Sequence, residues 1–224
     1  MCIRDRKEDK IILLTSTYGE AEGLVSDLIS ILGEELVYPF LVDDSPMVEF
    51  LISSQEKIIS RVEALRFLTD SSKRGILVCN IAASRLILPY PNVFKDSIVK
   101  ISVGEEYDQH AIIHQLKEIG YRKVTQVQTQ GEFSLRGDIL DIFETSQISP
   151  YRIEFFGDEI DGIREFDAET QLSKDSQSQV LIYPASDILL TDEDYHRGQK
   201  FLEHEIDKAI SPTCLLYTSP SPRD

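Results

Sequence analysis

Basic residues are scarce in this sequence. It holds 23 Lys and Arg against 39 Asp and Glu among its 224 residues, which gives a net charge of -16. A surface that binds duplex DNA through its phosphates usually carries a basic stripe. The average field of this chain would repel DNA, and its acidity instead favours a soluble, monomeric protein.

Cysteines and long apolar runs are also few. Cys2, Cys79 and Cys214 are the three cysteines, and none stands in a CxxC or Cys/His spacing, so the sequence predicts no zinc site. This cysteine usage suits a reducing cytoplasm. No apolar stretch approaches the ~18 residues of a membrane span, and no signal peptide is recognisable. We therefore expect a cytoplasmic protein without membrane contacts.

Catalytic motifs are missing as well. A phosphate-binding loop needs the pattern GxxxxGK[ST], and no such run occurs. In a helicase-type sheet, the apolar run 75–80 would end in an acidic pair that holds magnesium, but here Asn80 is followed by Ile-Ala-Ala-Ser. No GxSxG is present either. We expect no catalytic, cofactor-binding or metal-binding residues, and no enzyme activity in this chain.

Both ends of the sequence look foreign to the rest. Residues 1–6 (MCIRDR) and 214–224 (CLLYTSPSPRD) resemble translated sequencing-adapter sequence rather than protein. We treat these two stretches as non-native tails. The chain is then expected to be a fragment that has neither of its native termini.

The first part of the body alternates apolar runs with amphipathic segments. A hydrophobic share of 42% is enough to form a core. Buried strands are predicted at 10–16, 36–42 and 75–80, and helices at 20–32 and 55–68. This alternation predicts an α/β fold with a parallel sheet over residues 7–97.

The pattern changes near residue 97. A strand at 97–103 and a short helix at 110–119 lead into KVTQVQTQ, FSLRGDILDIF and YRIEFFGDEIDGIREF, which are separated by turn residues. A strand at 180–183 follows. We expect a mostly antiparallel α+β domain over 98–184, and then a helix over 192–210.

One strand of this second domain has two different faces. Alternation places Ile153 and Phe155 on one side, and Arg152 and Phe156 on the other, with the latter two ~13 Å apart along the strand. Arg136 joins that second face if its strand pairs with this one. An exposed ring flanked by guanidinium groups is typical of a protein-binding hot spot. The alternative is that the ring tucks under a turn and the arginines pair with local carboxylates.

The runs RGDILDIF and YRIEFFGDEID closely resemble the signature shared by the excision-repair protein UvrB and the transcription-repair coupling factors. The resemblance extends over about residues 10–211, including KIILLTSTYGEAEGLVSDLI, ILVCNIAASRLILP and GEEYDQHAIIHQLKEIGYRKVTQVQTQGEF. In its wording the chain looks most like coupling factors of streptococcus-like bacteria.

The resemblance implies a domain organisation and a partner. Residues 7–97 would be a truncated, degenerate helicase-like (RecA-type) domain without a nucleotide site. Residues 98–184 would be the inserted domain that docks UvrA, and 185–213 would begin the helical return to the first domain. By motif position, the residues that contact UvrA are Arg136, Arg152 and Phe156.

The family's other activities belong to segments outside this chain. The resemblance implies an ATP- and magnesium-dependent motor that moves on DNA and displaces stalled RNA polymerase, with UvrA recruited by the front module for excision repair. RNA polymerase and DNA would be partners only through those other segments.

The alternative is a fragment of UvrB itself, an ATP-dependent protein that verifies DNA damage. UvrB carries a tyrosine-rich hairpin after its second strand, where stacking aromatics contact DNA. The equivalent stretch here, 38–51, reads YPFLVDDSPMVEFL and has neither a tyrosine cluster nor a basic residue. The sequence therefore favours the coupling factors.

Overall fold

The computed structural model describes residues 10–43, 55–189 and 192–210. These residues fall into two compact units, one up to Leu189 and one from Leu190 onward, and each is described by itself. The proposed non-native tails, 1–6 and 214–224, lie outside the described residues, as do 44–51 of the stretch that separates the two family alternatives.

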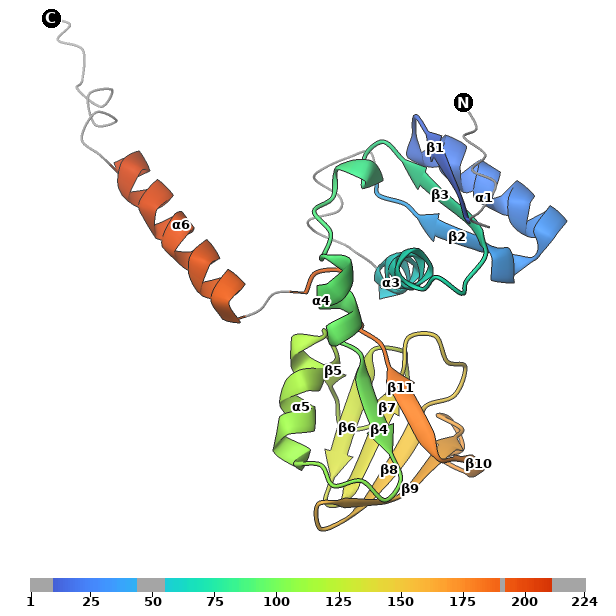
Figure 1. The fold of residues 1–224 in the computed structure, drawn as a ribbon, viewed down its shortest axis with the longest axis vertical. Coiled ribbons are helices and arrows are strands. Elements are labelled where there is room, and N and C mark those ends of the chain that lie inside the picture. Colours follow the sequence, from blue (N-terminus) through green and yellow to red (C-terminus); the bar gives the residue numbers. More distant parts are fainter. Residues whose placement is uncertain (1–9, 44–54, 190–191, 211–224) are drawn as a thin grey trace, which may run out of the picture. The chain divides into compact units, whose positions relative to one another are not determined.

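The first unit begins with a three-stranded parallel sheet (Figure 1). Its strands are β1 (Lys10–Thr15), β2 (Val37–Phe40) and β3 (Gly75–Asn80), in the order β1-β3-β2. Ile76 and Val78 of β3 pack with α1 (Tyr18–Leu32), whereas Leu77 and Cys79 pack with α3 (Gln55–Thr69). The two helices therefore cover opposite faces of the sheet.

The chain then crosses into an antiparallel part. Helix α4 (Pro91–Asp96) leads to β4 (Val99–Ser102), which pairs with the distant β11 (Gln179–Ile182). Between them lie α5 (Gln109–Glu118) and a six-stranded sheet in the order β10-β9-β8-β7-β6-β5. The strands of this sheet are β5 (Arg122–Lys123), β6 (Glu132–Arg136), β7 (Ile139–Phe143), β8 (Tyr151–Phe156), β9 (Glu159–Phe166) and β10 (Ser173–Gln177).

Two hairpins of this sheet have the same dipeptide, Gly-Asp, at their turns. Gly137-Asp138 joins β6 to β7, and Gly157-Asp158 joins β8 to β9. The glycines have φ values of 61° and 65°, a left-handed conformation that glycine adopts without a Cβ penalty. A glycine at the first loop position is typical of a tight hairpin turn, which fixes the register of the strands on either side.

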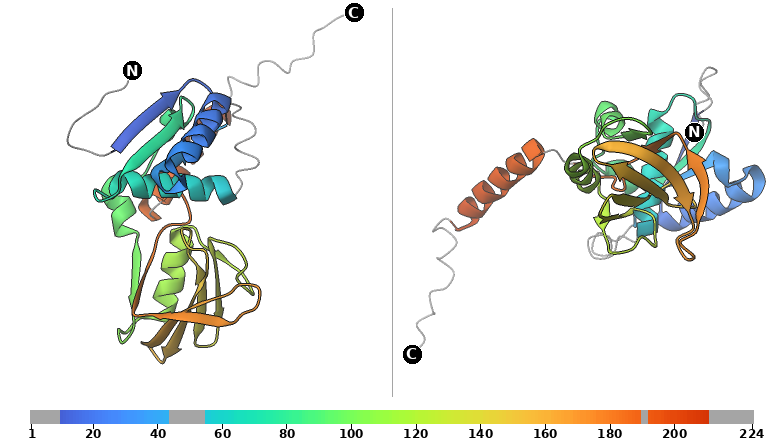
Figure 2. Two further views of the ribbon diagram at one scale, coloured as in Figure 1. Left: turned by 90° about the vertical axis from the view of Figure 1, so that its right-hand side faces the viewer. Right: turned by 90° about the horizontal axis from the view of Figure 1, so that it is seen from below.

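The core of the antiparallel part lies on one face of the six-stranded sheet. Helix α5 and the β4–β11 ribbon lie against the six-stranded sheet (Figure 2). They contribute Ile112, Leu116, Ile101 and Ile182, which pack on inward side chains of β6 to β9. A bulge between β8 and β9 lets both Ile160 and Ile163 point inward, although they are three residues apart. We call the opposite face of the sheet the outer face. It carries Arg136 of β6, Asp141 of β7, and Arg152 and Phe156 of β8.

Helices α3 and α4 connect the parallel part to the antiparallel part. Val62, Leu65 and Phe94 pack with Tyr183 and Leu189, which follow β11. Two charged contacts accompany this packing: Arg61 forms a buried ion pair with Asp187 at 2.6 Å, and the Arg66 guanidinium lies 3.6 Å from the Tyr183 ring centroid. Apolar and ionic contacts together hold the two parts in one unit.

The predicted fold class is confirmed: an α/β chain with a small parallel sheet, followed by mostly antiparallel strands. Most expected strands and helices are present within a few residues. The stretch KVTQVQTQ (123–130) is different, because only its first residue, Lys123, belongs to a strand (β5) and the rest is irregular. FSLRGDILDIF is not one strand but the β6–β7 hairpin, and α4 and β10 were not predicted.

The second unit contains α6 (Asp192–Ile210), at the bounds expected from the sequence. Tyr195, Phe201, Leu202 and Ile206 of this helix are exposed apolar residues. Within the described ranges, no helix has the length and apolar character needed to cross a membrane.

Glu144, just after β7, is a carboxyl group with no exposed surface. Its oxygens accept hydrogen bonds from Ser146 N at 2.9 Å and Thr145 Oγ1 at 3.1 Å. Burial raises the pKa of Glu144 above its ordinary 4.5, and the hydrogen bonds from Ser146 and the charge of Arg66 offset only part of that rise. The folded state therefore binds a proton at this position more readily than the unfolded state.

We expect this proton uptake to stabilise the fold as the pH falls. Stability from Glu144 is fully present below pH 4.5 and is lost as the pH rises through the raised folded-state pKa. Urea unfolding of the wild type and Glu144→Gln, from about pH 7 to pH 4.5, measures the difference. The unfolding free energy of the wild type should rise relative to that of the variant as the pH falls. If the two unfolding free energies change in parallel with pH, the pKa shift of Glu144 is wrongly assigned.

Candidate protein-binding site

The outer face of the six-stranded sheet carries the sequence-predicted site. Alternation along β8 turns Tyr151, Ile153 and Phe155 into the core and leaves Arg152 and Phe156 on the outer face. Phe156 is the last residue of β8 before the Gly157-Asp158 turn, and it is 81% exposed. A ring of this size left in water on a sheet face is an available anchor for a partner protein.

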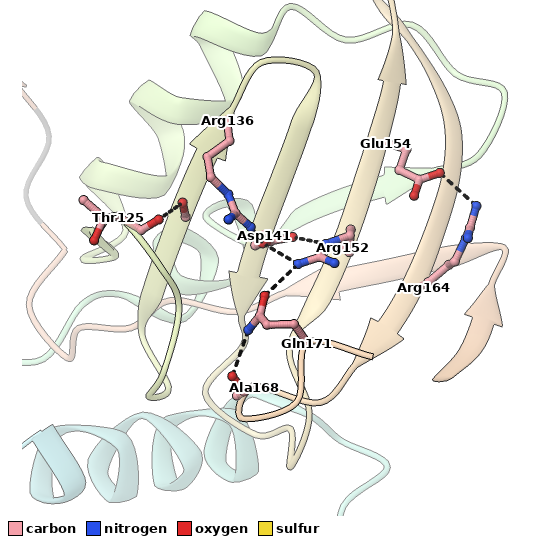
Figure 3. Close-up of polar contacts among 9 residues, drawn as sticks. Thr125, Arg136, Asp141, Arg152, Glu154, Arg164, Ala168 and Gln171 are labelled. Atoms are coloured by element: carbon pink, nitrogen blue, oxygen red, sulfur yellow. Dashed lines mark hydrogen bonds and ion pairs between the residues drawn. The ribbon is translucent and has the colours of Figure 1, made fainter. Parts of the chain in front are cut away.

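A single carboxylate lies between the two predicted arginines (Figure 3). Asp141 of β7 has a side chain that is only 2% exposed. Its Oδ1 accepts from Arg152 Nε at 2.7 Å, and its Oδ2 accepts from Arg152 Nη2 at 2.9 Å and from Arg136 Nη2 at 2.8 Å. Such charge-assisted contacts are the strong class of hydrogen bond, and the pair with Arg152 is bidentate.

Arg152 is held from several sides. Its Nη2 also donates to Gln171 Oε1 at 3.1 Å, and its guanidinium lies 4.2 Å from the centroid of the buried Phe166 ring. The hydrogen bonds to Asp141 raise the pKa of Arg152. Only 15% of its side chain is exposed, whereas 51% of the Arg136 side chain is exposed. The two arginines therefore differ in what they can offer a partner.

A third arginine lies on the same face. Arg164 of β9 stands opposite Arg152 in the strand register, where two like charges would repel. The two cations pair with different carboxylates: Arg152 pairs with Asp141, whereas Arg164 Nη2 contacts Glu154 Oε2 at 2.9 Å. This second pair is much more exposed than the pair of Arg152 with Asp141, so it contributes less to stability.

The structure brings Arg136, Arg152 and Phe156 together on one face, as the strand alternation required. The path by which Arg136 arrives there is not the expected one: its strand β6 pairs with β7, and β7 separates it from β8. Both arginines do pair with a local carboxylate, as the alternative interpretation held, but the ring is not tucked under a turn. Whether these three residues bind UvrA stays a prediction.

Sequence reasoning missed the residues that organise this face. Asp141 interrupts the apolar run ILDIF, and a carboxylate in the middle of a buried strand has to find a cation. That signal was readable once β6 and β7 were seen as a hairpin. Gln171 carried no such signal, because a single glutamine in the loop after β9 does not indicate which side chain it will contact; its backbone has a left-handed φ of 59°.

Metal-ion sites and surface pockets are two other kinds of site that a protein chain can form. Within the described residues, no group of three or more His, Cys, Asp or Glu side chains is arranged to hold a metal ion. Two surface pockets, with volumes of about 220 and 170 Å³, are lined by none of Arg136, Arg152 and Phe156.

Comparison with known proteins gives the antiparallel part a family. The model of the UvrB interaction domain family matches residues 99–188, which run from the start of β4 to just past β11. This match contains the whole six-stranded sheet and therefore all the outer-face residues described above.

Relatives extend the similarity to the parallel part. The transcription-repair-coupling factor of Staphylococcus epidermidis is 34% identical over 211 residues, 94% of this chain and 17% of that protein. Those of Staphylococcus haemolyticus and Staphylococcus aureus are also 34% identical, over 85% and 84% of this chain and 16% of theirs. The chain spans about a sixth of the length of these relatives. It therefore belongs to the transcription-repair-coupling factor family, as a segment of its N-terminal region that carries a UvrB interaction domain.

Proposed function

We propose that this chain is a protein-docking module that recruits UvrA in transcription-coupled excision repair. The observation that carries the proposal is the outer face, where an 81% exposed Phe156 shares one side of the sheet with two guanidinium groups fixed on one carboxylate. The ring fills an apolar pocket of the partner, and an arginine donates to the partner's carboxylates. The family match supports a partner in DNA repair, and UvrA is the partner that the sequence signature implies.

The docking module needs no nucleotide of its own. In a nucleotide-binding sheet, the backbone N–H groups at a helix N-terminus bind phosphate. At the N-terminus of α1, side chains of the chain accept such hydrogen bonds instead: Thr17 Oγ1 accepts from Glu20 N, and Glu20 Oε2 accepts from Ser16 N at 3.1 Å. Asn80, at the end of β3, uses its amide to accept from Val42 N and donate to Val42 O. We propose that the chain is not an enzyme and binds neither ATP nor magnesium.

The remaining functions of the family are assigned to other segments of its proteins. In this proposal, an ATP-driven motor acts on DNA and displaces stalled RNA polymerase, and the present chain contacts both only through those segments. The acidic net charge of -16 supports this division, since a basic stripe is the usual means of binding phosphates. The site of action is the cytoplasm.

Calorimetric titration of the full chain with purified UvrA tests the proposal. We expect saturable binding of UvrA, no heat from ATP with magnesium, and weak, salt-sensitive DNA affinity. The same titration with UvrB in place of UvrA serves as a specificity control. Absence of UvrA binding by the folded chain would refute the assignment.

A further inference from the structure

We propose that Asp141 is the positioning residue of the docking surface: its buried carboxylate fixes the guanidinium groups of Arg136 and Arg152, so that Arg136 and Phe156 meet the partner. Arg152 then acts from beneath, as part of the support. This inference rests on the proposed function, because it assigns roles within the same site.

Asp141 can influence a partner only through the arginines. Its side chain is 2% exposed, and each of its oxygens accepts at least one hydrogen bond from a guanidinium group. A partner that approaches the outer face meets Arg136 and Phe156 before it can reach this carboxylate. Any effect of Asp141 on binding therefore reports how the arginines are held.

Arg152 resembles a structural brace more than a contact residue. Asp141 fixes its Nε and Nη2 edge, Gln171 accepts from Nη2, and the Phe166 ring packs on the guanidinium. The side chain of Gln171 is in turn fixed by donation from its Nε2 to Ala168 O at 2.8 Å. Its backbone takes the left-handed φ of 59°, a conformation that costs a residue with a Cβ some strain. Such strain persists where surrounding contacts over-determine the position.

Arg136 is the accessible cation of the pair. It gives one hydrogen bond to Asp141 through Nη2, and half of its side chain remains exposed. The other N–H donors of its guanidinium group have no hydrogen-bond partner among the described residues. A guanidinium already held by one bond has fewer rotamers to lose when a carboxylate of the partner binds its free edge, which lowers the entropic cost of association.

Positioning and simple charge attraction predict opposite results for one substitution. Asp141, Arg136 and Arg152 together carry a formal charge of +1, because one carboxylate faces two guanidinium groups. Asp141→Asn raises this to +2 and keeps the side-chain shape. If charge alone drew in an acidic partner, the variant would bind UvrA more tightly. If Asp141 positions the arginines, the variant binds more weakly.

Calorimetric titration of the full chain with UvrA is the test. We expect Asp141→Asn to weaken binding about tenfold, and to change affinity less than about twofold when Arg136→Ala is already present, because coupled residues are non-additive. Equal or tighter binding by a folded Asp141→Asn chain would overturn the positioning role. So would a tenfold loss that persists unchanged in the Arg136→Ala background.

A second variant serves if Asp141→Asn fails to fold. Arg136→Lys keeps the formal charge at an exposed position but removes the planar fork that can hold Asp141 and reach outward together. We expect about fivefold weaker binding with unchanged thermal stability. Unchanged affinity would overturn the inference. Phe156→Ala distinguishes failure of the proposed function from failure of the inference about Asp141. If Phe156→Ala binds UvrA like the wild type, the docking surface itself is wrongly assigned. If Phe156→Ala binds weakly but Asp141→Asn and Arg136→Lys bind like the wild type, only the positioning role of Asp141 is wrong.

Discussion

Replacing Phe156 with alanine is expected to weaken UvrA binding about 30-fold or more, which corresponds to about 2 kcal/mol or more of binding free energy. The ring is 81% exposed, so its removal takes little from the folded chain and leaves the hairpin turn beside it intact. The loss should therefore appear in the titration with UvrA and not in the urea midpoint.

Ile148 supplies a matched control for this experiment. It is another large apolar side chain of the same sheet domain, 96% exposed, in the loop between β7 and β8 at the opposite end of these strands from Phe156. Ile148→Ala should leave both the UvrA affinity and the stability unchanged. If the two variants behave alike, exposed apolar area in general, and not the Phe156 position, governs the interaction.

Arg152→Ala is expected to cost about 3 kcal/mol of unfolding free energy, because it leaves the Asp141 carboxylate buried with less compensation. It also removes the cation that covers the Phe166 ring. Urea unfolding of the full chain measures this effect. A loss of UvrA binding by this variant would mix instability with lost contact, so it cannot by itself identify a contact residue.

Arg164→Ala is the corresponding control, since this arginine also pairs with a carboxylate on the outer face. Its pair with Glu154 is partly exposed, and such pairs contribute about 0–1 kcal/mol. The double variant Asp141→Ala/Arg152→Ala should recover part of the stability lost in Arg152→Ala, because the buried charge is gone. Equal costs for Arg152→Ala and Arg164→Ala would mean that burial of Asp141 is unimportant.

The predictions for Phe156→Ala and Arg152→Ala assign different roles to residues that the sequence pattern groups together. Strand alternation treated Arg136, Arg152 and Phe156 as equivalent members of one face. Their surroundings separate them: Phe156 is exposed, Arg136 is half-exposed, and Arg152 is largely covered. A mutational test that treats them alike would confuse support with contact.

The parts of this fold that periodicity governs could be predicted from the sequence. The parallel strands and their helices have apolar patterns with a single explanation, and β8 shows a period of two that fixes its faces. The resemblance in RGDILDIF and YRIEFF added the family, which the similarity to known proteins confirms, whereas UvrA as the partner stays a prediction. These predictions needed only neighbours along the chain.

The remainder depended on neighbours across the sheet. The Gly137-Asp138 pair is a local signal for a tight turn in FSLRGDILDIF, but the apolar residues that continue on both sides of it favour a single strand. Without that turn, Asp141 could not be placed between Arg136 and Arg152. Strand β10 was missed for a different reason: its sequence, SKDSQ, is polar throughout, and it pairs at the edge of the sheet without an apolar face.

The two Gly-Asp turns have a consequence for how this surface can diversify. Arg136 and Phe156 are each the last strand residue before such a turn, so the length of each loop determines which way the adjoining side chains point. One inserted residue would send the outward set of a strand into the core. Evolution can therefore exchange side chains on this face one at a time, but a change of chain length at either turn that shifts the strand register would displace the whole face at once.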